Sequence, residues 1–312
     1  MKNSQVISDI EENIRRNLKG KGIVACSGGL DSTVLSVIAS KAFPERILVV
    51  FVDTGLLRKN ESDSVRKLFA EQGLNFKILN AEERFFRALK GKTDPEEKRK
   101  IIGSLFIDIF NEEAERFGCE YLLQGTIAPD WIESGGGVRD NIKSHHNVGG
   151  LPKNMKLKLI EPLRDLYKDE IREISHSLGI DRYRQPFPGP GLAIRVIGEV
   201  TKERVELVRD ATYIVEDEVR KYYSDPEELP WQYFAVLLPV RTVGVTGDNR
   251  IYGQAVSLRI VDSVDAMTAT AATVPAELLR TIAERITRES PGQITRVLFD
   301  VTDKPPATIE WE

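Results

Sequence analysis

The feature that most constrains this chain is a short polar loop with adjacent glycines, Ser27-Gly28-Gly29-Leu30-Asp31-Ser32-Thr33. The loop follows an apolar run over 22–26 and precedes an amphipathic segment over 34–42, which indicates a strand, a tight turn and a helix. Glycine lets a backbone approach a bound anion closely, and the first amides of a helix attract phosphate. The loop therefore predicts a site for the phosphates of ATP.

The side chains of this loop indicate which kind of phosphate site it forms. A Walker A loop carries a lysine for the terminal phosphates, and this loop contains no lysine. It offers instead the hydroxyls of Ser27, Ser32 and Thr33 and the carboxylate of Asp31, which suit a magnesium-bound pyrophosphate that leaves intact. The alternative is an ordinary glycine turn with a Ser or Asp helix cap. We expect the whole loop to bind ATP, with Asp31 as a Mg²⁺ ligand.

Composition argues against several other functions. A chain of 312 residues with 41% hydrophobic residues can form about two domains, and its net charge of −4 argues against a nucleic-acid partner. The cysteines, Cys26 and Cys119, form no C-x-x-C pair, so no disulfide framework, iron–sulfur cluster or metal centre is expected from them. The start of the chain lacks a signal-peptide pattern and no apolar run approaches ~18 residues, so we expect a cytoplasmic protein without a membrane span.

The first half of the chain predicts an α/β fold with a doubly wound parallel sheet. Buried strands are expected over 22–26, 47–52, 76–79 and 121–123, each separated by helical stretches. Ligands bind such sheets at the carboxyl ends of the strands. We therefore expect the loop at Ser27, the stretch that contains Asp53 and the stretch 124–126 to meet, with Asp53 as a further ATP-binding residue.

The second half predicts a separate, smaller α+β domain. Residues 127–157 lack periodicity and are expected to form a cationic lid, and the proline-rich run 185–191 marks the domain boundary. This gives domains over 1–185 and 192–312. Within them we expect helices over 164–178, 201–222 and 275–287, the last capped by Thr273, and strands, taken as antiparallel, over 233–245, 254–261, 294–301 and 308–311.

The motif S-G-G-x-D-S resembles the signature of the PP-loop ATP pyrophosphatases, which cut ATP between its α and β phosphates. The segments 141–152, 186–194 and 304–312 resemble the lid, the proline-rich turn and the terminus of GMP synthetases. The resemblance implies an adenine nucleotide alpha hydrolase-like fold and the amination of XMP to GMP. In that reaction ATP adenylylates XMP, AMP and pyrophosphate are released, and ammonia is the nitrogen donor.

The resemblance also implies roles for individual residues. In the lid, Asp130, Glu133 and Lys143 match catalytic positions; the alternative is that they are exposed loop charges. In the second domain, the positions that match XMP contacts are Gln232, Arg296, Lys304 and Glu310. Two of these residues have a structural alternative: Arg296 could pair with an acid, and Gln232 could satisfy a strand edge.

The chain reaches its ATP loop by residue 27, so we expect it to lack the amino-terminal glutamine amidotransferase domain of other GMP synthetases. It therefore resembles the separate synthetase subunit of two-subunit GMP synthetases, with ammonia supplied by a glutaminase subunit. The resemblance, and the apolar runs 234–238 and 256–260, which need partners, predict a homodimer. The alternatives are an ammonia-dependent NAD synthetase and a nucleotide-binding module of the same fold without catalysis.

Overall fold

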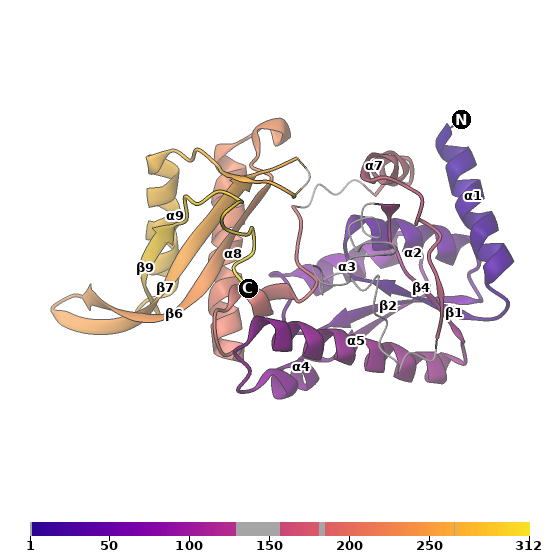
Figure 1. The fold of residues 1–312 in the computed structure, drawn as a ribbon, viewed down its shortest axis with the longest axis horizontal. Coiled ribbons are helices and arrows are strands. Elements are labelled where there is room, and N and C mark those ends of the chain that lie inside the picture. The colour runs from indigo at the N-terminus through magenta and orange to yellow at the C-terminus, as the bar shows by residue number, and fades with distance from the viewer. Residues whose placement is uncertain (1, 129–156, 181–184, 265) are drawn as a thin grey trace. The chain divides into compact units, whose positions relative to one another are not determined.

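The computed structural model describes residues 2–128, 157–180, 185–264 and 266–312 (Figure 1). The chain divides into two compact units. Unit 1 comprises 1–54, 60–85 and 99–184, and unit 2 comprises 55–59, 86–98 and 185–312. Two short segments from the first half of the chain thus belong to unit 2, an arrangement that periodicity along the sequence does not reveal. The domains expected over 1–185 and 192–312 stay a prediction.

Unit 1 contains a parallel five-stranded sheet in the order β3-β2-β1-β4-β5. The strands are β1 (Gly22–Cys26), β2 (Ile47–Asp53), β3 (Phe76–Asn80), β4 (Tyr121–Leu123) and β5 (Lys158–Ile160). The predicted doubly wound α/β fold is confirmed, and β5, only three residues long, is an additional strand. From β1 the chain continues to β2 and β3 on one side and later to β4 and β5 on the other, so the topological switch point lies between β1 and β4.

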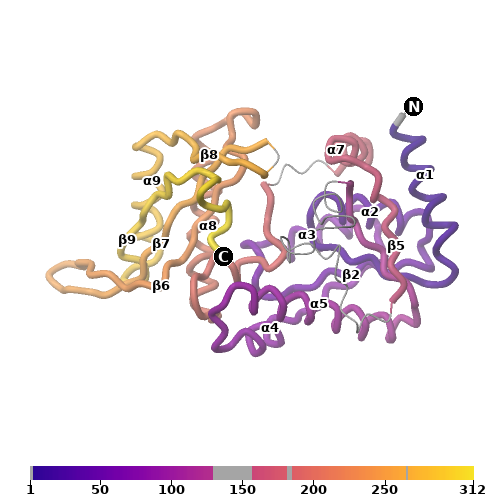
Figure 2. Tube along the Cα trace, viewed as in Figure 1, coloured from indigo at the N-terminus to yellow at the C-terminus, as the bar shows by residue number. Residues whose placement is uncertain are grey.

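Helices cover this sheet, as its buried central strands require. The helices of this part of the chain are, in order, α1 (Lys2–Asn17), α2 (Leu30–Ala42), α3 (Glu61–Glu71), α4 (Glu82–Leu89), α5 (Pro95–Phe117) and α7 (Lys168–Ser177). The sequences of α4 and α5 each cross from one unit to the other. Helix α2 packs on β1, α1 and α7 (Figure 1), and the three helices can be followed in Figure 2. All residues of α2 from Ser32 to Ser40 are buried. This packing fixes the position of its amino-terminal turn.

Unit 2 combines helices α8 (Lys202–Tyr222) and α9 (Ala276–Glu289) with a four-stranded sheet. The hairpin of β6 (Gln232–Thr246) and β7 (Asn249–Asp262) is its main part, and both β8 (Thr270–Ala271) and β9 (Ile294–Phe299) pair with β7. The 3₁₀ helices η1 (Gly191–Arg195) and η2 (Pro226–Glu228) complete the unit. The predicted smaller α+β domain is thus confirmed.

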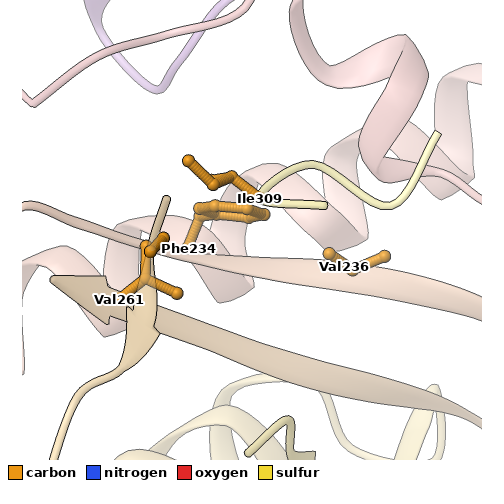
Figure 3. Close-up of a cluster of buried hydrophobic side chains, with 5 residues drawn as sticks. Phe234, Val236, Val261 and Ile309 are labelled. Carbon is orange, nitrogen blue, oxygen red and sulfur yellow. The ribbon is translucent and has the colours of Figure 1, made fainter. Parts of the chain in front are cut away.

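Phe234, Val236, Val261 and Ile309 form part of a buried cluster in unit 2 (Figure 3). The runs 234–238 and 256–260, which were expected to need a second copy, are buried or half-buried within the unit, and α8 packs on both β6 and β7. This ground for a homodimer was therefore wrong. Ile309 contributes to the cluster although its segment forms no strand.

Three local expectations in unit 2 were also wrong. The segment 308–311 is not a strand, because it makes no ladder; Glu310 binds Arg195 and Ile309 enters the buried cluster instead. Strand β9 runs parallel, not antiparallel, to β7. Helix α9 begins at Ala276 with Pro275, not Thr273, as its N-cap.

None of the helices in the described ranges is both long enough and apolar enough to cross a bilayer.

Candidate functional site

The phosphate loop is held by its own hydroxyl groups. Gly29 is the N-cap of α2, and its carbonyl accepts hydrogen bonds from the hydroxyls of Ser32, at 3.1 Å, and Thr33, at 2.7 Å. The backbone amide of Ser27 donates to the Ser32 hydroxyl at 3.2 Å. These bonds fix the turn between β1 and α2, while Ser27 and Gly29 are exposed. The loop is thus ordered before it meets a ligand.

Gly28 is required by the conformation and by the space around it. Its φ of +80° lies in the left-handed region, which favours glycine. A Cβ here would lie 3.2 Å from the side chain of Val65 and 3.3 Å from the ring of Phe51. The loop therefore packs directly against α3 and β2, and a side chain at this position would push it away from both.

The loop after β4 approaches the same helix start. A Cβ on Gly125 would lie 2.9 Å from the backbone nitrogen of Ser32, so only glycine allows this approach. The expected meeting of the loops that follow β1 and β4 is therefore confirmed, and it occurs at the switch point of the sheet. Asp53 ends β2, and its carboxylate accepts a hydrogen bond from the Ser62 hydroxyl at 2.5 Å.

Thr126, which follows this glycine, is 4% exposed. Its hydroxyl has no hydrogen-bond partner within the described part of the chain. A buried hydroxyl without a partner costs free energy, so such a group calls for an explanation. Thr126 directly follows Gly125, which lies against the backbone of Ser32 at the start of α2. A ligand bound at this helix start could therefore supply the missing hydrogen bond.

A lysine that the sequence did not predict places a positive charge at this site. Lys168, the first residue of α7, places its ammonium 2.9 Å and 2.8 Å from the two carboxylate oxygens of Asp31. The pair is partly exposed, with 43% of the Lys168 and 23% of the Asp31 side chain accessible. The PP-loop lacks its own lysine, and α7 brings one to it from far along the chain.

In unit 2 the structure brings together two of the residues expected to contact XMP. The Gln232 amide donates to the Glu310 carboxylate at 3.3 Å. Arg195, only 1% exposed, binds both oxygens of that carboxylate at 2.7 Å and 3.0 Å. The rings of Phe234 and Phe187 lie 3.7 Å and 5.2 Å from its guanidinium carbon. Arg195 was not expected from the sequence, although it directly follows the proline-rich block that carries the resemblance.

The other two expected XMP residues lie elsewhere in unit 2. The ammonium of Lys304 donates to the carbonyl of Ala266 at 2.8 Å. Arg296 is exposed on β9. Among the described residues neither makes a hydrogen bond or ion pair with Glu310, so the grouping of all four stays a prediction.

The expected lid residues Asp130, Glu133 and Lys143 lie outside the described residues. Where the structure does describe the chain, no group of three or more His, Cys, Asp or Glu side chains forms a metal centre. Cys26 is buried, and burial raises the pKa of the half-buried Cys119 thiol. A raised thiol pKa argues against an activated nucleophile at Cys119.

Comparison with known protein families gives a match in each half of the chain. Residues 21–102 match the phosphoadenosine phosphosulfate reductase domain, and residues 217–311 match the GMP synthase C terminal domain. A protein of Thermoplasma acidophilum that is named as a subunit of glutamine-hydrolyzing GMP synthase is 61% identical over the full length of both chains. Proteins of the same name from Pyrococcus horikoshii (57% identical, 97% of this chain, 98% of the relative) and Methanocaldococcus jannaschii (53%, 98% of each) are similar. The chain therefore belongs to this family of GMP synthase subunits.

Proposed function

We propose that this chain, a ligase of the GMP synthase family, converts XMP to GMP with ATP and ammonia through an adenylyl-XMP intermediate. The observation that carries the proposal is the start of α2, where glycine loops, Lys168 and Asp31 gather at the switch point of a parallel sheet. Full-length similarity to proteins named as GMP synthase subunits supports GMP as the product.

In this proposal unit 1 binds ATP. The exposed loop at Ser27 and Gly29 receives the pyrophosphate, and the helix start and the Lys168 ammonium offset its negative charge. The oxygen at C2 of XMP attacks the α phosphorus as a ring nitrogen of the xanthine base gives up its proton, the bond from that phosphorus to the pyrophosphate oxygen breaks, and the pyrophosphate leaves. Ammonia then attacks C2, AMP leaves with the oxygen, and the nitrogen loses a proton.

The residues at this site fit a magnesium ion. Mg²⁺ is usually held by one or two carboxylates together with phosphate oxygens, and Asp31 supplies one carboxylate beside the loop. When bound, the ion supplies charge neutralisation on the pyrophosphate. Both oxygens of Asp31 now contact Lys168, so the carboxylate also holds the lysine at the phosphate loop.

Unit 2 is proposed to bind XMP through Glu310 and Gln232, with Arg296 and Lys304 for its phosphate. The support is that Arg195 and Gln232 orient the Glu310 carboxylate before substrate arrives. Asp130, Glu133 and Lys143 stay proposed lid residues for the transfer step. The cytoplasmic location stays a prediction.

The relatives are named as subunits, which supports a partner for this chain, and we propose that the partner is a glutaminase that supplies ammonia. We also propose a homodimer, now on a different surface. Val243 and Val245 lie on one face of β6, Tyr252 pairs with Val243 on β7, and these side chains are 46%, 73% and 57% exposed. Sedimentation across micromolar concentrations tests this: the wild-type protein should form a dimer, and Val245→Asp should weaken it. A monomeric wild type would contradict the proposal.

The reaction is tested by incubating the pure chain with ATP, Mg²⁺, XMP and ammonium, and measuring GMP, AMP and pyrophosphate. We expect the three products in equal amounts. Replacing XMP with nicotinic acid adenine dinucleotide tests the NAD synthetase alternative and should give no NAD. If the wild-type chain releases no XMP-dependent AMP and forms no GMP, the proposal fails.

A further inference from the structure

Lys98, in the first turn of α5, is a fully buried charged side chain of unit 2. Its ammonium donates to the carbonyl of Val196 at 2.9 Å, to the carbonyl of Ala193 at 3.3 Å, and to the carboxylate of Glu312. Burial of an ammonium is costly unless it is paired, and here each of its three protons has an acceptor. The structure thus gives the buried ammonium three acceptors, all of them from unit 2.

The partner of Lys98 belongs to the terminal tail, residues 304–312. The side chain of Glu312 is 6% exposed, and its second oxygen accepts a hydrogen bond from the Gly198 amide at 3.1 Å. Glu310, two residues earlier, is bound by Arg195. The segment 193–198 therefore holds both tail glutamates, and Lys98 ties that segment to the tail.

This arrangement is better suited to setting a geometry than to adding stability. A buried ion pair seldom stabilises a fold more than apolar side chains of equal volume, because both charges lose their hydration. It does impose fixed directions and distances. Glu312 is held at both of its oxygens, and only Trp311 separates it from Glu310. The contacts of Lys98 and Gly198 to Glu312 thus restrain the chain two residues from Glu310.

We propose that Lys98 is a positioning residue for XMP, which acts through Glu312 to fix the carboxylate of Glu310. The proposal rests on the proposed function, in which Glu310 contacts XMP. Loss of the Lys98 contact removes one of the bonds that hold Glu312 and loosens the end of the tail, while Gly198 still contacts Glu312 and Arg195 and Gln232 still contact Glu310. XMP binding then weakens, while the ATP loop in unit 1 keeps its own contacts.

The experiment measures KM for XMP, KM for ATP, kcat and the thermal midpoint in Lys98→Met, Glu312→Gln and the double variant. We expect KM for XMP to rise about tenfold in each single variant, with KM for ATP within about twofold of wild type. The double variant should show no more than the larger single effect, because the two side chains act as one unit. Glu312→Gln keeps the size and a hydrogen-bond acceptor, so it tests the proposal even if Lys98→Met fails to fold.

Lys92→Met is the matched control, since Lys92 belongs to the same unit and its ion pair with Glu97 is 38% and 45% exposed. It should leave all four quantities unchanged. Folded variants with wild-type KM for XMP would contradict the positioning role alone, as would KM values for XMP and ATP that rise together. A wild-type chain that forms no GMP would contradict the proposed function and the positioning role together.

Discussion

Lys168 holds both carboxylate oxygens of Asp31, at 2.9 Å and 2.8 Å, although 137 residues separate the two in sequence. Asp31 alone would repel phosphate at the start of α2, where the helix dipole attracts it. The ammonium offsets that repulsion. In the proposed function the PP-loop thus receives from α7 the cation that a Walker A loop carries within its own sequence.

Replacing Lys168 with Met tests this role. We expect KM for ATP to rise about tenfold or more, because a hydrogen bond to a charged group contributes about 1.5–3 kcal/mol and about 1.4 kcal/mol equals a factor of ten. KM for XMP should stay near wild type. Lys158→Met is the control, because Lys158 in β5 forms an exposed pair with Glu120. Equal KM values for ATP in the two variants would show that Lys168 has no role in ATP binding.

Gly125→Ala tests the contact between the loop after β4 and the helix start. The added methyl group would meet backbone atoms of Ser32 at 2.9 Å and 3.0 Å, which cannot move without shifting α2. We expect a loss of about 1–3 kcal/mol in the free energy of unfolding and a clear rise in KM for ATP. Urea titration and steady-state kinetics measure the two effects.

Gly103→Ala provides the comparison for that variant, because Gly103 lies within α5 and a Cβ there meets nothing within 4 Å. In a helix interior alanine is favoured over glycine by about 1 kcal/mol, so this variant should be slightly more stable than wild type. If Gly125→Ala were as stable and active as Gly103→Ala, the close approach would have no consequence.

The hydroxyl of Thr126 predicts an unusual response to Thr126→Val. Since this buried hydroxyl has no partner among the described residues, its removal should leave the free energy of unfolding unchanged or raise it by about 1 kcal/mol. KM for ATP should nevertheless rise if a bound nucleotide completes the hydrogen bond. Thr212→Val is the matched control: Thr212 is also buried, but its hydroxyl accepts from the Ala235 amide at 3.3 Å. That variant should lose about 1–3 kcal/mol, and a similar loss in Thr126→Val would show a structural partner.

Local patterns were sufficient to predict the phosphate loop and the strands beside it. The strand over 22–26 was placed at its observed bounds, because a short apolar run next to glycine leaves few alternatives. The cations were not predictable in this way. Lys168 and Lys98 meet their acidic partners across 137 and 214 residues, and in the sequence each is only a lysine at the start of a helix.

The tail shows how a local pattern can mislead. Residues 308–311 alternate polar and apolar side chains, which is typical of a strand, yet Ile309 enters a core cluster while Glu310 binds Arg195. The alternation reflects two different tertiary environments, not a sheet. The runs 234–238 and 256–260 misled in a similar way, because α8 covers surfaces that were assigned to a second copy.

Arg285 of α9 joins two helices of unit 2 and predicts a pH-dependent stability. It pairs with Asp217 and Glu218 of α8, and hydrogen bonds from Arg285 and Lys221 lower the pKa of Asp217 below its model-compound value of 3.8. A carboxyl group whose pKa is lowered by folding stabilises the folded state above its unfolded pKa, and this contribution is lost as the pH falls through the folded pKa.

Arg285→Met should therefore cost about 1–2 kcal/mol at pH 7 and progressively less as the pH falls below about 4. Urea titrations across this range measure the difference, and Arg288→Met, an exposed arginine of the same helix, should show no such trend. A cost for Arg285→Met that does not change with pH would assign the effect to the packing of its side chain.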